Sequence, residues 1–277
     1  MEISQELFTF PFQDEKWVSR AVTGGLIALA AYIFIFAGAY LWWLILPICL
    51  YFVGLALYIP LAGYGVRSMR HVIQTGEVAL PVWDDAEGIF RDGLLMAVPG
   101  FVYLLPMLIV YGLATVLFVL AGVSPLAMER YPTLGIVGLA TGYAGGFMLM
   151  GCGFLVALVL GFWTFVASTR AVAENRISAA FEVGEVWTLL KAGIGPYLLS
   201  IGMMYGVAIL ATIAMQFLTY TIILCCVVPF LYCGFTWYMV TVTGALSGMA
   251  YRAAQAKLDA TSSGPEADRP LPDMAGE

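Results

Sequence analysis

Titratable side chains that could do chemistry gather in one segment of the sequence. His71, the single histidine, is followed by Glu77, Asp84, Asp85 and Glu87. One histidine with several carboxylates could bind a metal ion, and Asp84 with Asp85 could act as a general acid and base. Because no second histidine or ligand-spaced cysteine pair accompanies His71, we favour a solvated histidine. The two aspartates are more simply explained as the cap of a helix that begins there, with negative charge at its positive end.

No other motif indicates catalysis or a cofactor. The sequence has no phosphate-binding loop and no dinucleotide fingerprint. Its cysteines lie in apolar segments at spacings that match no zinc site, as small buried side chains would; they are Cys49, Cys152, Cys225, Cys226 and Cys233. The 18 Asp+Glu outnumber the 12 Lys+Arg, and this acidic balance excludes a nucleic-acid-binding protein. We therefore expect a protein that is not an enzyme and that uses no metal or cofactor.

A second group of candidates consists of arginines and tryptophans that flank apolar segments. They are Arg67, Arg70, Arg91, Arg170, Trp83 and Trp187. Such side chains could hold anionic lipid headgroups at a membrane surface. The simpler alternative is that the arginines only set the orientation of the chain across the membrane.

Glycines recur at every fourth residue in three apolar segments. The series are Gly138, Gly142 and Gly146, then Gly202 and Gly206, and finally Gly244 and Gly248. This spacing lets helix backbones approach closely in lipid. The glycine faces could build the core of the protein, which we favour, or could dock another membrane protein or a second copy of the chain.

The elements that must position all these residues are membrane-spanning helices. Of the 277 residues, 62% are hydrophobic and 11% are charged, against about 45–50% and about 25% in soluble domains. Several uncharged runs exceed the roughly 20 residues that cross a bilayer. No ionisable residue falls inside the hydrocarbon part of a predicted span, which argues against a proton relay and against passage of a charged substrate.

The distribution of lysine and arginine predicts an all-α bundle of about six spans with amphipathic interfacial helices in its cytoplasmic loops. The spans are expected at about 20–40, 44–70, 94–121, 134–171, 195–217 and 221–250. This arrangement places every lysine and arginine except Arg130 on the cytoplasmic side, with both termini, as the positive-inside rule requires. We expect the protein in the cytoplasmic (inner) membrane. Because the fourth span is too long for a bilayer, it must tilt, kink or begin as a separate short segment, and we place the expected break in the glycine-rich stretch 135–153.

Three regions follow from this topology. Residues 1–20 form an amphipathic interfacial segment, 21–253 the six-helix transmembrane domain, and 254–277 a disordered acidic cytoplasmic tail. Within the domain, 44–121 and 134–217 each contain a span that ends in arginine, a linker, an acidic amphipathic helix and the next span. We interpret the pair as a weak direct repeat. The alternative is that the two segments look alike only because amphipathic helices between spans settle at the membrane interface.

Several motifs of the chain are similar to those of one family. They are FPFQDEKW at 10–17, GYGVR at 63–67, LPVWDD at 80–85 and AAFEVGE at 179–185. Over roughly residues 8–215 the chain resembles a bacterial and archaeal family of polytopic membrane proteins, the domain of unknown function 4013. The resemblance implies the membrane topology and, at fold level only, a distant likeness to the membrane part of some glycerophosphodiesterases. It implies no reaction and no catalytic residue.

Two functions fit these observations. The first is a non-catalytic scaffold or accessory subunit that packs against membrane lipids, other integral membrane proteins or itself. The alternative is a permease or lipid-handling protein for an apolar or amphipathic substrate, because prolines could break helices around a cavity. Those prolines are Pro47, Pro60, Pro99, Pro106, Pro196 and Pro229. A cavity between the second, third and fifth spans would favour the alternative.

Overall fold

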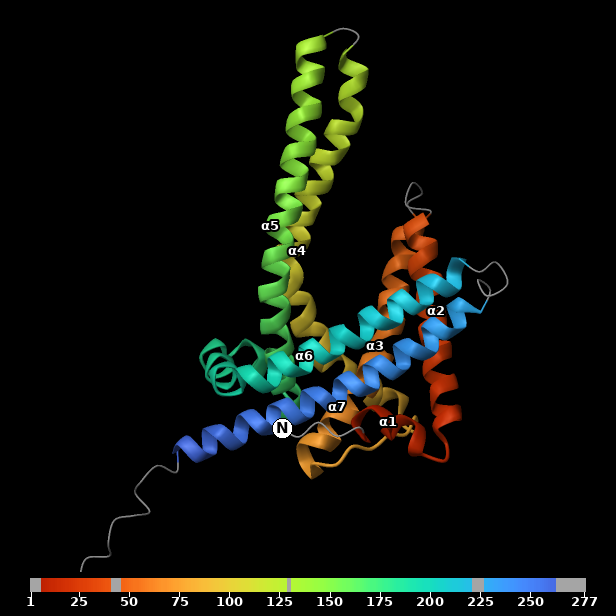
Figure 1. The fold of residues 1–277 in the computed structure, drawn as a ribbon, viewed down its shortest axis with the longest axis vertical. Coiled ribbons are helices and arrows are strands. Elements are labelled where there is room, and N and C mark those ends of the chain that lie inside the picture. The colour runs from red at the N-terminus through yellow and green to blue at the C-terminus, as the bar shows by residue number, and fades with distance from the viewer. Residues whose placement is uncertain (1–5, 41–45, 129–130, 221–226, 263–277) are drawn as a thin grey trace, which may run out of the picture. The chain divides into compact units, whose positions relative to one another are not determined.

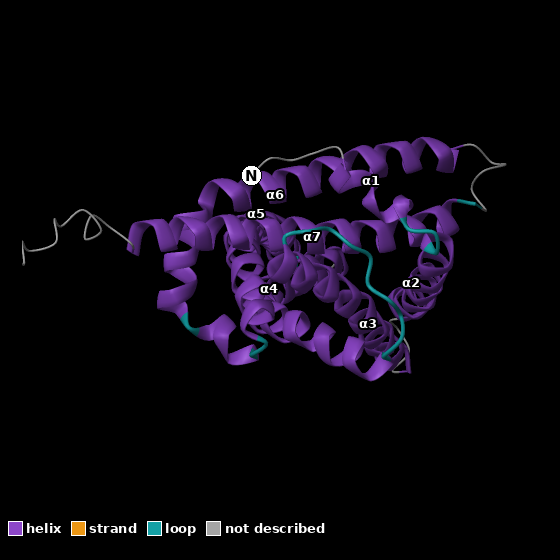
Figure 2. Cartoon of the chain, turned by 90° about the horizontal axis from the view of Figure 1, so that it is seen from below, coloured by secondary structure: helices purple, strands orange, loops and turns teal. Residues whose placement is uncertain are grey.

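The fold is taken from a computed structural model, which describes residues 6–40, 46–128, 131–220 and 227–262. All regular structure in these ranges is helical, which confirms the expected fold class (Figure 2). The helices, labelled in Figure 1, are α1 (Glu6–Gln13), α2 (Trp17–Tyr40), α3 (Leu46–Thr75), α4 (Ala86–Met128), α5 (Pro132–Glu174), the short 3-10 helix η1 (Ile177–Phe181), α6 (Val183–Tyr220) and α7 (Val228–Ser262).

Five of these helices, α2 to α6, are long and apolar enough to cross a membrane. The sixth long helix, α7, is not among them, although it occupies the place of the sixth predicted span. It carries hydroxyl side chains such as Thr236, Thr241 and Ser247, which are buried against its neighbours. Buried hydroxyl side chains of this kind lower the mean hydropathy of α7.

The chain divides into two compact units, which we describe separately. The larger unit consists of Met1–Ala97 and Val166–Glu277, and the smaller unit is Val98–Phe165. In the larger unit α7 contacts α1, α2, α3 and α6, and it runs side by side with α6 (Figure 1). Two glycines allow α7 to approach α3 closely. A Cβ atom at Gly244 would lie 2.2 Å from the carbonyl oxygen of Gly65, and one at Gly248 would lie 2.7 Å from that of Met69.

The smaller unit is a helical hairpin formed by the adjoining parts of α4 and α5. Its two helices meet through the glycines of α5. A Cβ atom at Gly142 would lie 2.8 Å from the carbonyl oxygen of Leu117, and one at Gly146 would lie 2.9 Å from the ring of Phe118. Many large apolar side chains of this hairpin are exposed, as those of a lipid-facing surface are.

The helices are more continuous than the sequence led us to expect, in three places. The expected break in 135–153 is wrong, because α5 continues through this stretch and its glycines lie against α4. Pro60, Pro99, Pro106 and Pro196 lie inside continuous helices, as prolines in membrane helices can when neighbouring groups satisfy the freed carbonyls. The acidic helices expected in the loops are the first turns of α4 and α6 and are continuous with them.

The two terminal segments also differ in part from expectation. Helix α1 packs on α7, where Leu7 and Phe10 are 2% and 5% exposed and the Tyr238 hydroxyl donates to the carbonyl oxygen of Phe8. Protein therefore covers part of the apolar side of this segment, and its expected place at the membrane surface stays a prediction. At the other end, α7 continues to Ser262, past the expected start of the tail at residue 254, because Ala254 is buried against α6. The rest of the tail, Arg130, Cys225 and Cys226 lie outside the described residues.

Candidate functional site

The linker between α3 and α4 folds back along α3 and is fastened there by its LPVWDD sequence. Arg20 donates to the carbonyl oxygen of Leu80 at 2.8 Å, and the Tyr64 hydroxyl donates to that of Pro81 at 2.9 Å. The Trp83 ring stacks on Tyr64 with 4.3 Å between the ring centroids. The LPVWDD motif thus links the first turn of α2 to the C-terminal half of α3.

Two arginines of α3 share three carboxylates. Arg67 forms ion pairs with Asp84 at 3.2 Å, Asp85 at 3.0 Å and Asp92 at 3.2 Å. The other oxygen of Asp92 accepts from Arg70 at 2.8 Å. Asp92 is 8% exposed, so both guanidinium groups neutralise a buried carboxylate. Sequence reasoning missed Asp92 because it lies inside the amphipathic stretch that we assigned to the membrane surface.

Asp85 caps α4, as the sequence suggested. Its Oδ1 accepts the N–H of Gly88 at 2.9 Å. This hydrogen bond and the neighbouring Arg67 hold the pKa of the exposed Asp85 carboxyl below its usual range. Asp84 does not cap the helix, and its carboxylate points to Arg67. The two carboxylates therefore have different structural roles, a helix cap for Asp85 and an ion pair with Arg67 for Asp84.

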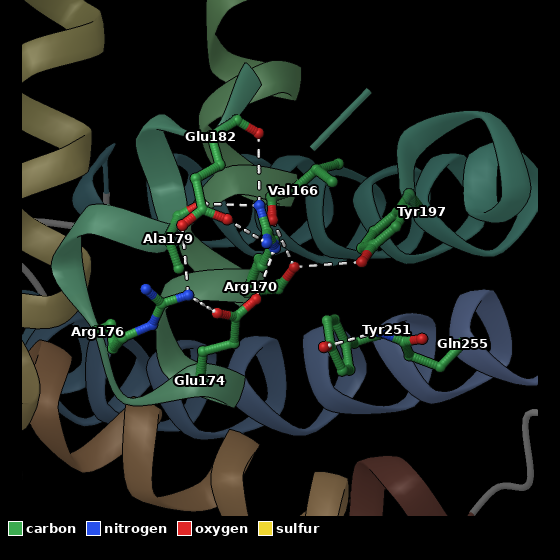
Figure 3. A network of polar contacts seen from close by, with 10 residues as sticks. Val166, Arg170, Glu174, Arg176, Ala179, Glu182, Tyr197, Tyr251 and Gln255 are labelled. Atoms are coloured by element: carbon green, nitrogen blue, oxygen red, sulfur yellow. Dashed lines mark hydrogen bonds and ion pairs between the residues drawn. The ribbon is translucent and has the colours of Figure 1, made fainter. Parts of the chain in front are cut away.

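A second arginine cluster closes the connection between α5 and α6 (Figure 3). Arg170 is 9% exposed and pairs with Glu174 at 2.7 Å and with Glu182, and it also donates to the carbonyl oxygen of Ala179. Arg176 pairs with the same two glutamates, which raise the pKa of its guanidinium. In both connections, α3 to α4 and α5 to α6, an arginine near the end of one long helix therefore forms an ion pair with an acidic residue next to the start of the following helix.

These clusters change what the proposed headgroup residues can do. Arg67, Arg70 and Arg170 are engaged by carboxylates of the chain. Trp83 is half-buried against Tyr64. Arg91 is exposed and takes part in no ion pair among the residues described, and Trp187 is 50% exposed. Lys191, which we had not singled out, places its ammonium 5.6 Å from the Trp187 ring.

The glycine series have different surroundings. Gly138, Gly142 and Gly146 contact α4, and Gly244 and Gly248 contact α3. A Cβ atom added at Gly202 or Gly206 would meet no described atom within 4 Å. The α5 and α7 series therefore serve packing within the chain, while the α6 pair faces away from it.

The larger unit contains a mostly apolar pocket of about 380 Å³ between its long helices. The pocket is lined by Tyr32 of α2, by Tyr58, Ala62, Gly65 and Met69 of α3, by Met96 of α4, by Met204, Tyr205 and Ala208 of α6, and by Tyr232, Phe235, Thr236, Met239, Val240, Thr243 and Gly244 of α7. None of these residues is charged. Helices α3, α4 and α6 correspond to the second, third and fifth predicted spans, so the pocket lies where a cavity would favour a lipid-handling protein.

Hydroxyl groups supply the polar part of the pocket wall. The Tyr32 and Thr236 hydroxyls are 3.4 Å apart, and Thr236 also donates to the carbonyl oxygen of Tyr232. The hydroxyls of Tyr58 and Thr243 form no hydrogen bond with any residue that the structure describes. Sequence reasoning missed these residues because tyrosine, threonine and methionine in an apolar helix are also typical of a packed interior.

Comparison with protein families matches residues 48–220 to the family described as Protein of unknown function (DUF4013). The match begins about 40 residues after the start of the resemblance noted in the sequence, runs slightly past its end, includes both arginine clusters and ends before α7. No curated protein and no solved structure matches the chain.

Proposed function

We propose that this chain, which belongs to the family Protein of unknown function (DUF4013), is a lipid-handling integral membrane protein. It binds an apolar or amphipathic membrane molecule in the pocket between α2, α3, α6 and α7. It acts by binding and not by catalysis. In the arrangement that we propose, it spans the cytoplasmic membrane several times, with both termini and both arginine clusters on the cytoplasmic side.

The pocket is the observation that supports this proposal. Four methionines line it, Met69, Met96, Met204 and Met239, and each is contributed by a different helix. Methionine is flexible and polarisable, so it adapts to irregular apolar ligands. A pocket of about 380 Å³ with few polar groups falls in the size range of small-molecule sites. The pocket is open to the surface beside Tyr205 and Tyr232, which are exposed, so a membrane molecule could enter it from the side.

A scaffold or accessory subunit is the second candidate, and the open glycines of α6 favour it. Gly202 and Gly206 lie one turn apart on a face with no described atom near them, and such a face fits close contact with another helix. Crosslinking in native membranes from cysteines placed at these two positions tests this candidate. A partner captured at both positions supports it, and a chain that crosslinks to no protein argues against it.

Filling the pocket tests the lipid-handling proposal. Ala208→Trp places a large ring in the pocket wall, and Ala214→Trp, on an exposed part of the same helix, is the matched control. The purified variants are illuminated with a photoactivatable diacyl lipid in nanodiscs, and the labelled peptides are identified by mass spectrometry. We expect Ala208→Trp to lose labelling of the pocket peptides by about tenfold or more, which is about 1.4 kcal/mol of binding free energy.

The labelling experiment can also contradict the lipid-handling proposal. Equal labelling of the pocket peptides in Ala208→Trp and Ala214→Trp contradicts the proposal. Because a tryptophan can also unfold a helix bundle, thermal unfolding in detergent is measured for both variants. Ala62→Phe, which fills the pocket from α3, provides an independent variant.

A further inference from the structure

We infer that the molecule held in this pocket is a neutral lipid, whose polar group is a hydroxyl or a carbonyl and carries no phosphate or amine. This inference rests on the proposed function and specifies the ligand class of the same site. It follows from the chemistry of the wall, from the direction of the arginines of α3 and from pocket hydroxyl groups that have no hydrogen-bond partner among the described residues.

The wall can solvate a dipole but not a charge. Its polar atoms belong to tyrosines and threonines, and none of the residues that line it is ionised at neutral pH. A buried phosphate or ammonium without an opposite charge pays a desolvation penalty far larger than that of a hydroxyl or a carbonyl. A phospholipid headgroup placed here would lack the counter-charge that makes its burial tolerable.

The nearest arginines cannot supply that charge. Gly65 and Met69 of α3 line the pocket and lie four residues apart, on one face of the helix. Arg67, two residues from each, projects from the opposite side and is held by Asp84, Asp85 and Asp92. Arg70 is held by the same Asp92. Moving either guanidinium to the pocket would take from the buried Asp92 one of its two cationic partners, so neither arginine of α3 is readily available to the ligand.

The hydroxyl groups are suited to a neutral acceptor or donor. Thr236 donates to the carbonyl oxygen of Tyr232, so its oxygen can accept a hydrogen bond from Tyr32, 3.4 Å away. Tyr58 and Thr243 carry hydroxyls with no hydrogen-bond partner in the described part of the chain. Both residues are half-buried and line the pocket, where an ester carbonyl or an alcohol of the ligand can pair with their hydroxyls. Methionine and aromatic side chains fill the rest of the wall and suit the hydrocarbon chain.

Binding of two lipids that differ only in the headgroup tests this inference. Dioleoylglycerol and dioleoylphosphatidic acid carry the same acyl chains, and native mass spectrometry measures their binding to the full chain in detergent. The part of the binding that Ala208→Trp removes is assigned to the pocket. We expect the pocket to bind dioleoylglycerol at least about tenfold more tightly than dioleoylphosphatidic acid.

Removing single hydroxyls adds a second readout. Tyr58→Phe and Thr243→Val delete the unpaired hydroxyls and keep the shape of each side chain, and Tyr220→Phe, on an exposed part of α6, is the matched control. We expect the two pocket variants to weaken dioleoylglycerol binding by about threefold to tenfold, as loss of one hydrogen bond does. The control should bind as the unmodified chain does.

The outcomes separate the inference from the function on which it rests. If dioleoylphosphatidic acid binds as tightly as dioleoylglycerol and Ala208→Trp removes both, the neutral-lipid inference is overturned and the lipid-handling proposal stands. If Ala208→Trp removes neither lipid, both are overturned. Dioleoylglycerol binding that is unchanged in Tyr58→Phe and in Thr243→Val also overturns the inference, because the hydroxyls would then play no part in recognition.

Discussion

Replacing Asp92 by asparagine tests the arginine cluster at the end of α3. Asp92 accepts a hydrogen bond from Arg67 Nε at 3.2 Å and another from Arg70 Nη2 at 2.8 Å. Asparagine preserves the size of the side chain but removes the charge, and its amide group must turn N–H donors toward one guanidinium. Both arginines would then lose a charged partner in a site where only 8% of Asp92 is exposed.

The cost follows from the number and burial of these contacts. Removing one partner of a buried ion pair costs about 3–5 kcal/mol, and we expect the lower end, about 3 kcal/mol, because the amide oxygen of asparagine still accepts one of the two hydrogen bonds. Asp84 pairs with the same Arg67, but its side chain is 69% exposed, and an exposed ion pair contributes no more than about 1 kcal/mol. Asp84→Asn is therefore a control that removes the same charge from the same cluster.

The assay is unfolding of the purified protein by sodium dodecyl sulfate in mixed micelles, followed by circular dichroism. We expect the free energy of unfolding to fall by about 3 kcal/mol in Asp92→Asn and by less than about 1 kcal/mol in Asp84→Asn. If Asp84→Asn costs as much as Asp92→Asn, burial does not govern the strength of these ion pairs and the reasoning fails.

Two further predictions concern α4. The Gly88 N–H and Arg67 lower the pKa of Asp85, so the stability that this carboxylate provides is present above the ordinary aspartate pKa and is lost as pH falls through the lowered value. Asp85→Asn should therefore flatten the acid side of a profile of melting temperature against pH, and an unchanged acid side would contradict this role. A Cβ atom at Gly63 would lie 1.8 Å from the carbonyl oxygen of Ile89, so Gly63→Ala should destabilise the protein by about 3 kcal/mol or more in the detergent titration. Gly100→Ala, with no described atom near its Cβ, should raise stability by about 0.5–1 kcal/mol, and equal losses in both variants would refute the close approach of α3 and α4.

The positions of the helices could be predicted from the sequence because a bilayer leaves a chain few alternatives. An uncharged run must satisfy its backbone internally, so it becomes a helix, and the predicted span 134–171 corresponds to α5, Pro132–Glu174. The third span was expected to begin near residue 94, but α4 begins at Ala86. The sequence contained the signal for this earlier start, because Asp85 was interpreted as a helix cap. The error was to treat the capped segment as a separate helix.

The partners of the charged residues could not be predicted. Arg67 and Arg70 look equivalent in the sequence, and only the packing of α3 against α4 shows that Asp92 lies between them. The pocket was hidden for the same reason. Tyr58 and Thr243 are far apart in the chain, and each is ordinary in an apolar helix until α3 and α7 are placed side by side. Pattern and composition determine which residues avoid water, but not which of them meet.

The length of α4 and α5 has a consequence for how the hairpin is accommodated. Each helix has 43 residues, which extend over about 65 Å at about 1.5 Å per residue. A helix inclined by about 40°, the steepest commonly found, traverses about 30 Å of hydrocarbon within roughly 26 residues. In a helix that crosses a bilayer at this angle, roughly 17 of the 43 residues would lie beyond the acyl chains, and the apolar stretch Ala86–Pro125 of α4 is long enough to make much of that part apolar. With a mismatch of this size, the helix turns outside the acyl chains would have to be shielded from water. Lipid headgroups, a locally deformed leaflet or another protein could do this.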